Sequence, residues 1–388
     1  MREQMWQRFL PGRQRGGRRG VGPAAVVLAV GVLTMGVAPA PTEAFAARPD
    51  TVQQGLDALV RSDGLPAALA SVRDRQGRTR THTAGVGDLA TGSKVPRDGQ
   101  VRIGSNTKTF TAVVVLQLVG EGKIGLDDLV DTHLKGLVRG DGIDGSKITV
   151  RQLLQHTSGI PDYEGLIPDS TLEYRYFDPR DLLDLALQQK ADFAPGERFK
   201  YSSSNYVLAG LIVQKVTGRP LAEEIDRRVV KRIGLRHTYF PAQGDRTIRE
   251  AHPRGYGRAS AGGPLHDFTE LDPSAGWAAG QMISTNSEVN QFFTALLAGD
   301  LLQPAQLAQM RTVVPIGDSG AGYGLGIISR PLSCGGVYWG HGGDIAGFET
   351  RGGVTDDGRA VNVAVTAVPT DGTATDHLEK VVDTALCR

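Results

Sequence analysis

Ser105 and Lys108 have the residue types and the spacing of a nucleophile and its base. They lie in the stretch GSNTK (104–108), which runs directly into the apolar segment TFTAVVVLQLVG (109–120). If this stretch opens a helix, residues three apart share a face, and the lysine amine reaches the serine hydroxyl. The helix N-terminus and burial both favour a neutral amine. A neutral amine can accept the serine proton as the oxygen attacks a carbonyl carbon.

A simpler interpretation of Ser105 is a helix cap, because serine is a preferred N-cap residue and Ser-x-x-Lys alone is a weak motif. Ser105 is, however, the only serine in the chain with lysine three places on. The segment that follows is apolar nearly all round, which predicts a buried helix. Burial would hold the first turn rigidly, as a nucleophile requires.

Two later stretches carry further candidates. In PGERFKYSSSNYVLAG (195–210), Tyr201 stands just before a predicted helix, and a nearby ammonium would favour loss of its proton. In YGLGIISRPLSCGGVYWGHGGDIAGF (323–348), a predicted strand ends in His341-Gly342-Gly343. Glycines allow close approach of the backbone to a ligand, and a strand edge can bind an extended peptide. The alternatives are a structural loop tyrosine and a polar residue at a strand end.

The elements that must position these residues change character along the chain. Residues 51–64 have helical spacing, and residues 68–88 resemble two strands around a Gln-Gly turn. Residues near 125 to 300 are mostly helical in pattern, and the segment after them consists of short strand-like runs and a closing helix. Strands at both ends with helices between them predict a sheet built from both termini, with an inserted helical lobe.

The N-terminal segment predicts export. A basic start (1–20) precedes an apolar stretch (21–40) and a small-x-small site that ends at Ala46. This order is typical of a signal peptide, so we expect residues 1–46 to be removed and the protein to be secreted into the cell-wall environment. A membrane anchor is the alternative, although the apolar run is short for a span. Arg18-Arg19 leaves open whether export uses a twin-arginine signal.

Charge and cysteine content narrow the partners. The formal net charge is +1 and no basic block follows the signal segment, so nucleic acid is not an expected partner. Cys334 and Cys387 are the only cysteines. In an exported chain an isolated pair usually forms a disulfide, with two free thiols as the alternative. Neither further cysteines nor a spaced histidine pair completes a metal site, so we expect no metal.

The three motifs in this order resemble those of serine β-lactamases and penicillin-binding proteins. The chain is similar to the branch of class C β-lactamases and secreted actinomycete D-alanyl-D-alanine carboxypeptidases, over nearly all of 50–388. The stretches that carry this resemblance include VRIGSNTKTFTAVVVLQLVGEGKIGLDD, ITVRQLLQHTSGI, NYVLAGLIVQKVTG, YGLG and LSCGG with the terminal ALC. It implies an α/β (α+β type) fold: an antiparallel sheet from both termini, flanked by helices, with an inserted mostly helical lobe. The lobes would comprise 47–115 with 300–388, and 116–299.

The resemblance also implies roles. Ser105 would be the nucleophile, Lys108 its base, Tyr201 the proton relay to the leaving group, and His341 a group that assists Tyr201. The backbone N–H groups of Ser105 and Asp344 would form the oxyanion hole. The carboxypeptidase has a disulfide that matches Cys334–Cys387. No metal or organic cofactor is implied, and the substrate would be a peptide or a β-lactam-like small molecule.

The sequence departs from the family pattern where substrate should bind. Ser203 stands where the family has asparagine, and it reaches less far. The carboxypeptidase binds its substrate's carboxylate with two threonines and an arginine, and the matching positions hold Gly342, Asp344 and Ile328. With Gly343, these residues are the candidate substrate-binding positions. A carboxylate beside Asp344 would be repelled. Arg330 compensates if it reaches in, since alternate residues share a strand face; alternatively, Asp344 faces solvent.

We therefore expect a secreted, monomeric serine hydrolase that forms an acyl-enzyme. It would resemble a D-alanyl-D-alanine carboxypeptidase or D-peptidase, with changed acceptance: peptides cut internally, amidated or esterified substrates, or an amine near Asp344. A β-lactamase and an esterase of the same family are the alternatives. A non-catalytic penicillin- or peptidoglycan-binding sensor is the alternative from another class. For His156 the pattern predicts capping or packing, and Asp162 and Tyr163 are expected at most to border the cleft.

Overall fold

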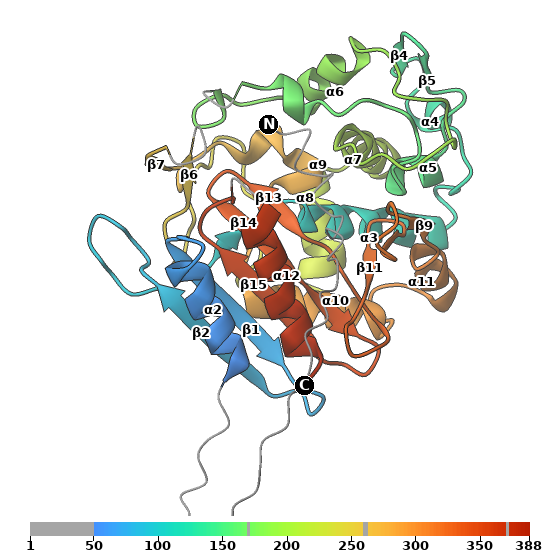
Figure 1. Ribbon diagram of the computed structural model, residues 1–388. Coiled ribbons are helices and arrows are strands. Elements are labelled where there is room, and N and C mark those ends of the chain that lie inside the picture. The colour runs from blue at the N-terminus through green and yellow to red at the C-terminus, as the bar shows by residue number, and fades with distance from the viewer. Residues whose placement is uncertain (1–49, 169–170, 259–262, 370–371) are drawn as a thin grey trace, which may run out of the picture.

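The computed structural model describes residues 50–168, 171–258, 263–369 and 372–388 (Figure 1). The predicted signal peptide, residues 1–46, lies outside the described residues. Within them the chain forms one large antiparallel sheet that both ends of the sequence contribute to, with helices on both of its faces and a largely helical region between residues 120 and 300.

The large sheet has the strand order β2-β1-β15-β14-β12-β11-β10-β9 in the described residues, with β13 paired to β14 at the side. Strands from the start of the chain therefore lie against strands from its end, and β1 pairs with β15 in antiparallel register from Ala68↔Val365 to Arg73↔Ala360. The strands are β1 (Ala67–Arg73), β2 (Thr79–Gly85), β9 (Val314–Pro315), β10 (Gly322–Tyr323), β11 (Ile328–Pro331), β12 (Val337–Gly340), β13 (Gly343–Ile345), β14 (Phe348–Thr355) and β15 (Ala360–Val365).

Helices are the main regular elements in the rest of the described chain. They are α2 (Thr51–Arg61), α3 (Asn106–Gly120), α4 (Val130–His133), α5 (Val150–Leu154), α6 (Pro179–Leu187), α7 (Ser204–Thr217), α8 (Leu221–Ile225), α9 (Trp277–Gly280), α10 (Asn286–Leu297), α11 (Pro304–Met310) and α12 (Gly372–Leu386). Single turns of 3₁₀-helix, η1 (Glu164–Leu166) and η4 (Pro273–Ala275), and a π-helical turn, η3 (Asp226–Val230), complete them.

The two faces of the sheet pack against different helices. Along β15, Val361, Val363 and Val365 join one apolar cluster with α2 and α12, whereas Ala360 and Ala364 join the larger cluster on the opposite side. This alternation is the period of a strand buried on both faces. Figure 1 shows α2 and α12 lying side by side across the near face of the sheet.

Helix α10 covers the other face and connects the sheet to α3. The side-chain amides of Asn286 and Asn290 donate to the carbonyls of Leu69 and Ser71 on β1. Phe292 of α10 stacks on Phe110 of α3, with ring centres 3.7 Å apart. The N-terminal part of α3 therefore packs against α10, which is hydrogen-bonded to β1 of the sheet.

The predicted fold class is confirmed, and so are most of the predicted elements. The strands around the Gln-Gly turn are β1 and β2, the helix that follows GSNTK runs to Gly120, and the final helix is α12. The pattern analysis did not predict three two-stranded ladders: β3 (Val101–Arg102) with β8 (Ile283–Ser284), β4 (Arg139–Gly140) with β5 (Ile143–Asp144), and β6 (Tyr256–Arg258) with β7 (Leu265–Asp267). Elements of two or three residues carry no periodicity for a sequence to display.

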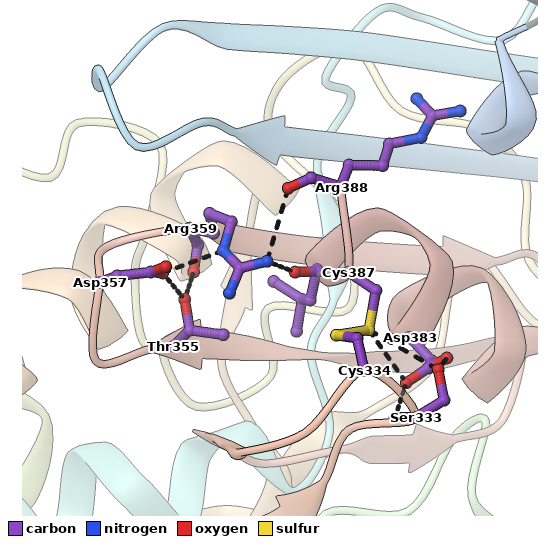
Figure 2. Close-up of a disulfide and its surroundings, with 9 residues drawn as sticks. Ser333, Cys334, Thr355, Asp357, Arg359, Asp383, Cys387 and Arg388 are labelled. Atoms are coloured by element: carbon purple, nitrogen blue, oxygen red, sulfur yellow. Dashed lines mark hydrogen bonds and ion pairs between the residues drawn. A yellow bond between two sulfur atoms is a disulfide. The ribbon is translucent and has the colours of Figure 1, made fainter.

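The predicted disulfide is present between Cys334 and Cys387 (Figure 2). It joins the turn between β11 and β12 to the residue after α12, and beside it Ser333 donates from both its backbone N–H and its hydroxyl to Asp383 of that helix. The final helix is therefore fixed to the sheet by a covalent bond and by its neighbours. In the described part of the chain, no helix has the length and apolar character needed to span a membrane.

Candidate active site

Ser105 stands at the N-cap position of α3, but its side chain makes no capping hydrogen bond. The capping interpretation therefore fails, and the hydroxyl is available for other contacts. The turn is held from several sides: Thr109 donates to the carbonyl of Gly326, Thr111 donates to that of Ala278, and Thr107 accepts from the N–H of Met282.

The amine of Lys108 lies where the spacing of the motif predicts. Its Nζ is 3.0 Å from Ser105 Oγ and 3.0 Å from the carbonyl oxygen of Ala279, and the side chain is completely buried. Burial lowers the pKa of the amine to about 8, while the carboxylates of Glu164 and Asp162 act in the opposite direction. A substantial fraction of the amine is then neutral near neutral pH, and it can accept the Ser105 proton.

Tyr201 completes the group around the serine hydroxyl. Its side chain is 7% exposed, its ring centre is 4.8 Å from Lys108 Nζ, and its ring stacks on that of His156 at 4.2 Å. Burial raises the pKa of the phenol well above its usual value, although a hydrogen bond with Ser105 opposes that rise. In the resting site burial therefore favours the protonated phenol.

His341 comes directly after β12 and does not bond to Tyr201. Its Nε2 is 3.0 Å from the hydroxyl of Tyr323, its Nδ1 is 2.6 Å from the carbonyl oxygen of Gly342, and its ring centre is 6.2 Å from that of Tyr201. Burial lowers the pKa of the imidazole to about 3. His341 is therefore a neutral neighbour of the tyrosine, one contact away through Tyr323.

Strand β13 lies directly against the backbone that leads into Ser105. A Cβ placed on Gly343 would lie 2.0 Å from the carbonyl oxygen of Ile103, and a Cβ on Gly104 would lie 2.9 Å from the backbone nitrogen of Asp344. Only glycines allow the two segments to come this close. The backbone nitrogen of Asp344 therefore lies beside the residue that precedes Ser105, and the oxyanion hole formed by the amides of Ser105 and Asp344 stays a prediction.

The Asp344 side chain is buried in an ion pair, which corrects two expectations. It is 2% exposed, and its Oδ1 accepts from Arg351 at 2.7 Å; Arg351 also pairs with Glu349 at 2.8 Å. Asp344 therefore neither faces solvent nor offers its carboxylate to a substrate amine. Arg330, expected to compensate by reaching in, is instead paired with Glu379 at 3.2 Å.

Arg351 also explains why residue 342 is glycine. A Cβ on Gly342 would lie 3.0 Å from Arg351 Nη1 and 3.1 Å from its Cδ, so the guanidinium occupies the space of the family's threonine. A cation is thus present beside Gly342, but it is already paired with the buried carboxylate of Asp344 and in contact with Glu349, whose pKa burial raises to about 8. The family resemblance implies an arginine at the position of Ile328, whereas the cation in this chain is Arg351 on β14.

Ser203 is a buried structural partner rather than a substitute for the family's asparagine. Its hydroxyl donates to Glu164 at 2.6 Å and its backbone N–H to Asp162 at 3.1 Å, and its side chain is completely buried. Burial and the neighbouring Glu164 raise the pKa of Asp162 to about 7. The expected contact of Ser203 with substrate is replaced by a pair of carboxylates whose charges act on Lys108.

Sequence reasoning missed several residues that the structure brings to the site, namely His156, Asp162, Glu164, Tyr323 and Arg351. The stretch HTSGI contributes His156, for which the pattern predicts capping or packing, and YGLG, which carries part of the family resemblance, contributes Tyr323. An imidazole held between two tyrosines has no short-range signature, since its partners are distant in sequence. Among the described residues, no group of three or more His, Cys, Asp or Glu side chains is arranged to hold a metal ion.

A serine–lysine pair at a buried helix start, beside an antiparallel sheet built from both ends of the chain, defines the β-lactamase/transpeptidase-like class of serine hydrolases. The family model described as Beta-lactamase matches residues 50–385, and the chain belongs to that family.

Solved structures in this class resemble the chain over most of its length. A D-stereospecific amidohydrolase from Streptomyces sp. is 40% identical, with 87% of this chain and 99% of that one covered at a TM-score of 0.80. The D-amino acid amidase from Ochrobactrum anthropi SV3, solved with L-phenylalanine amide, is 26% identical, with 86% and 96% covered at a TM-score of 0.77.

Curated relatives add two further names. Esterase EstB from Burkholderia gladioli is 29% identical over 321 residues, which are 74% of this chain and 80% of the esterase. Protein flp from Staphylococcus aureus is 33% identical over 138 residues, and the chain spans only 27% of its length.

Proposed function

We propose that the protein is a serine amidohydrolase that cleaves D-aminoacyl amides and D-amino-acid peptides without requiring a free C-terminal carboxylate. The observation that carries this proposal is the pairing of Arg351 with Asp344 and Glu349. The guanidinium is already paired with the buried carboxylate of Asp344, and burial raises the pKa of Glu349 to about 8, so Arg351 has little attraction left for a substrate carboxylate. The chain is 40% identical to a D-stereospecific amidohydrolase, which supports the same choice of substrate.

The reaction follows from the contacts around Ser105. As Ser105 Oγ attacks the amide carbonyl carbon, its proton passes to Lys108 Nζ, 3.0 Å away. The oxyanion that forms is bound by the backbone N–H groups of Ser105 and Asp344. The protonated Tyr201 hydroxyl gives its proton to the leaving nitrogen, the C–N bond breaks, and Lys108 returns a proton to the phenolate. Water then attacks the acyl carbon and gives a proton to Lys108; the bond from that carbon to Ser105 Oγ breaks, Lys108 returns the proton to Oγ, and the acid is released.

The substrate's ammonium group would be bound by Asp162 and Glu164. Both carboxylates act electrostatically on Lys108, and Glu164 also acts on Tyr201. A cationic amine on the acyl side of the scissile bond would therefore be attracted to the side of the site formed by η1. A relative solved with phenylalanine amide supports a substrate of this chemistry.

Kinetics on matched substrates test this function. We expect faster hydrolysis of D-phenylalanine amide than of its L-enantiomer, and comparable hydrolysis of a D-Ala-D-Ala peptide and its C-terminal amide. A marked preference for the free acid would instead assign a carboxypeptidase. Conversion of D-aminoacyl esters with no cleavage of amides would assign the esterase activity that the relative from Burkholderia gladioli suggests.

Labelling identifies the nucleophile independently of the substrate. A fluorescent penicillin is expected to add to the wild-type chain and to an exposed-serine control, Ser146→Ala, but not to Ser105→Ala. Rapid loss of penicillin without a lasting adduct would indicate a β-lactamase. Full biological effect in Ser105→Ala would support the non-catalytic binding protein.

We also propose that the enzyme acts outside the cell. The signal-like segment 1–46 supports this location, and a disulfide in the folded chain is consistent with an oxidising compartment. Cell fractionation would test it: the expected result is an extracellular chain that lacks residues 1–46, and a full-length cytoplasmic chain would contradict it.

A further inference from the structure

Three buried side chains form a continuous hydrogen-bonded chain behind Tyr201. His156 Nε2 is 3.1 Å from the Tyr323 hydroxyl, and that hydroxyl is 3.0 Å from His341 Nε2. The three residues come from the loop after α5, from β10, and from the segment between β12 and β13. All three are at most 2% exposed, so water does not compete for these bonds.

Backbone groups fix the two ends of this chain. His156 Nδ1 is 3.1 Å from the backbone N–H of Ser202, which can only donate, so Nδ1 must accept. His341 Nδ1 is 2.6 Å from the carbonyl of Gly342, which can only accept, so Nδ1 must carry the proton. The first imidazole is therefore protonated at Nε2 and the second at Nδ1.

With both imidazoles neutral, the hydroxyl between them links the two rings, and the Tyr206 hydroxyl is a further neighbour of it. His156 Nε2–H donates to Tyr323 Oη, and Tyr323 O–H donates to His341 Nε2. A second proton on His156 would point at the Ser202 N–H, and a second proton on His341 would leave the Tyr323 hydroxyl with a donor on either side. Burial also lowers the pKa of both imidazoles, which keeps them neutral in this arrangement.

We infer that His156 and Tyr323 are positioning residues that fix His341 as the Nδ1-protonated neutral tautomer. Because the Tyr323 hydroxyl is bonded to His341 Nε2, this nitrogen cannot accept the proton that Tyr201 transfers. His156 also stacks on the Tyr201 ring, with ring centres 4.2 Å apart. His156 therefore orients Tyr201 by direct contact, and it orients His341 through the hydroxyl of Tyr323. The phenol can then exchange its proton with Ser105, Lys108 and the leaving group, but not with His341. For catalysis this inference rests on the proposed function; the tautomers themselves do not.

The backbone of His156 supports the importance of this placement. Its φ is +59°, in the left-handed region that few residues other than glycine adopt. Asn205 Nδ2 also lies 3.2 Å from His156 Nδ1 and reinforces the acceptor role. A residue held in a strained conformation with every ring nitrogen bonded is placed by its surroundings rather than by local preference.

Long-range ¹H–¹⁵N spectra of the histidine rings test the tautomers directly, without any substrate. The sequence has eight histidines, and His156→Gln and His341→Gln assign the two signals. The expected result at pH 7 is an Nε2–H tautomer for His156 and an Nδ1–H tautomer for His341. The same tautomer in both rings, or an imidazolium in either, would overturn the inference.

Kinetics on the D-aminoacyl amide test the positioning role. Tyr323→Phe should lower kcat by about tenfold with little change in KM, and should release the His341 tautomer in the spectra. His156→Gln, which retains a side-chain N–H donor, should keep more activity than His156→Ala. Tyr338→Phe removes a buried hydroxyl that takes no part in the hydrogen bonds among His156, Tyr323 and His341, and its kcat should match that of the wild type. Unchanged kcat in Tyr323→Phe would refute the role, whereas a wild-type chain inactive on these amides would refute the proposed function and leave the tautomers standing.

Discussion

The Lys108 amine lies in a site that water barely reaches, with its Nζ bonded to Ser105 and to a backbone carbonyl. The surroundings that deprive it of solvent also make it a base, because they disfavour the ammonium. Asp162 and Glu164 limit this effect by attracting positive charge. The balance leaves a base whose proton affinity lies close to neutral pH, where proton transfer is efficient in both directions.

The first prediction concerns pH. Because the amine must be neutral to accept the serine proton and burial lowers its pKa to about 8, kcat/KM should rise with pH and level off above about 8. The substrate should lack a titrating group, so p-nitrophenyl acetate is suitable. A rate that falls as pH rises from 6 to 9 would mean that the charged amine is the active form.

The second prediction concerns Glu164. Its replacement by Gln keeps an acceptor for Ser203 but removes a charge, so KM for D-phenylalanine amide should rise by roughly 10-fold or more. The carboxylate raises the pKa of Lys108, so its loss should also move the acidic limb of the pH profile to lower pH. Glu250→Gln, at an exposed position, is the control. An unchanged KM would show that the ammonium is bound elsewhere.

At the scale of residues, the sequence predicts contacts between residues one helical turn apart, but it does not predict the register in which two strands pair. The spacing of Ser105 and Lys108 is a helix turn, so their contact could be predicted. Asp344 could not be placed, because its partner Arg351 lies on β14, and the pairing Asp344↔Glu349 sets which side chains face each other. A shift of one residue would have pointed Asp344 to the other face.

Among the elements, β13 has the least freedom. It lies between β14 and the backbone at Ile103–Gly104, next to the two amides for which we propose the oxyanion role. Gly343 of β13 and Gly104 opposite it are therefore required by contact with backbone atoms, which cannot move aside as a flexible side chain can. This is a second use of glycine, distinct from the freedom to turn.

The third prediction tests this close contact. Gly343→Ala would place a Cβ 2.0 Å from the Ile103 carbonyl oxygen, so β13 must shift and the oxyanion site must open. We expect kcat to fall by about 10²-fold or more, as when an oxyanion donor is lost. Gly372→Ala, which meets no atom within 4 Å, should have no effect. Activity within a few-fold of wild type in Gly343→Ala would show that the donors lie elsewhere.

The fourth prediction concerns the attachment of α12. Removal of the disulfide by Cys334→Ala with Cys387→Ala frees a loop with a sequence separation of 53. Loop-closure entropy then suggests a loss of about 4 kcal/mol in the free energy of unfolding. Urea unfolding of the oxidised, reduced and double-Ala chains measures it, and the reduced wild type should match the double-Ala chain. Equal stability of all three would mean that Ser333 and the packing of α12 suffice.

Elements were predictable where their pattern was long. The run AVNVAVTAV became β15, and the apolar segment after Ser105 became α3, because each repeats a period over many residues. The ladder of β3 and β8 joins residues Val101–Arg102 to Ile283–Ser284, far apart in sequence. A strand of two residues has no periodic pattern from which its partner strand could be predicted. This ladder nevertheless supports the segment that leads into Ser105.

For the whole molecule, the sheet could be predicted from strand-like runs at both ends of the sequence, since such runs must find partners. The way that the helical region meets the sheet could not be predicted. The site lies where the two meet: α3 and the Tyr201 loop face β13 and the segment that carries His341. Its geometry therefore depends on contacts among segments separated by more than a hundred residues, which no local pattern records.

The meeting of the first and last described residues has a consequence for chain connectivity. Arg388 reaches Asp50 and Thr51 with its guanidinium, so the start of α2 and the end of the chain share one edge of the sheet. The first and last described residues are therefore close enough to be joined by a short linker. A circularly permuted gene that joins residue 388 to residue 50 through roughly eight Gly/Ser residues should encode the same enzyme.

New termini between Lys135 and Gly136, an exposed turn, should leave hydrolysis of p-nitrophenyl acetate within about tenfold of wild type, because no buried backbone is cut. A second permutant opened between Thr111 and Ala112, inside the buried α3, should fail to fold. If the first permutant were also inactive, the covalent order of the chain, and not only its final arrangement, would be needed to assemble the sheet.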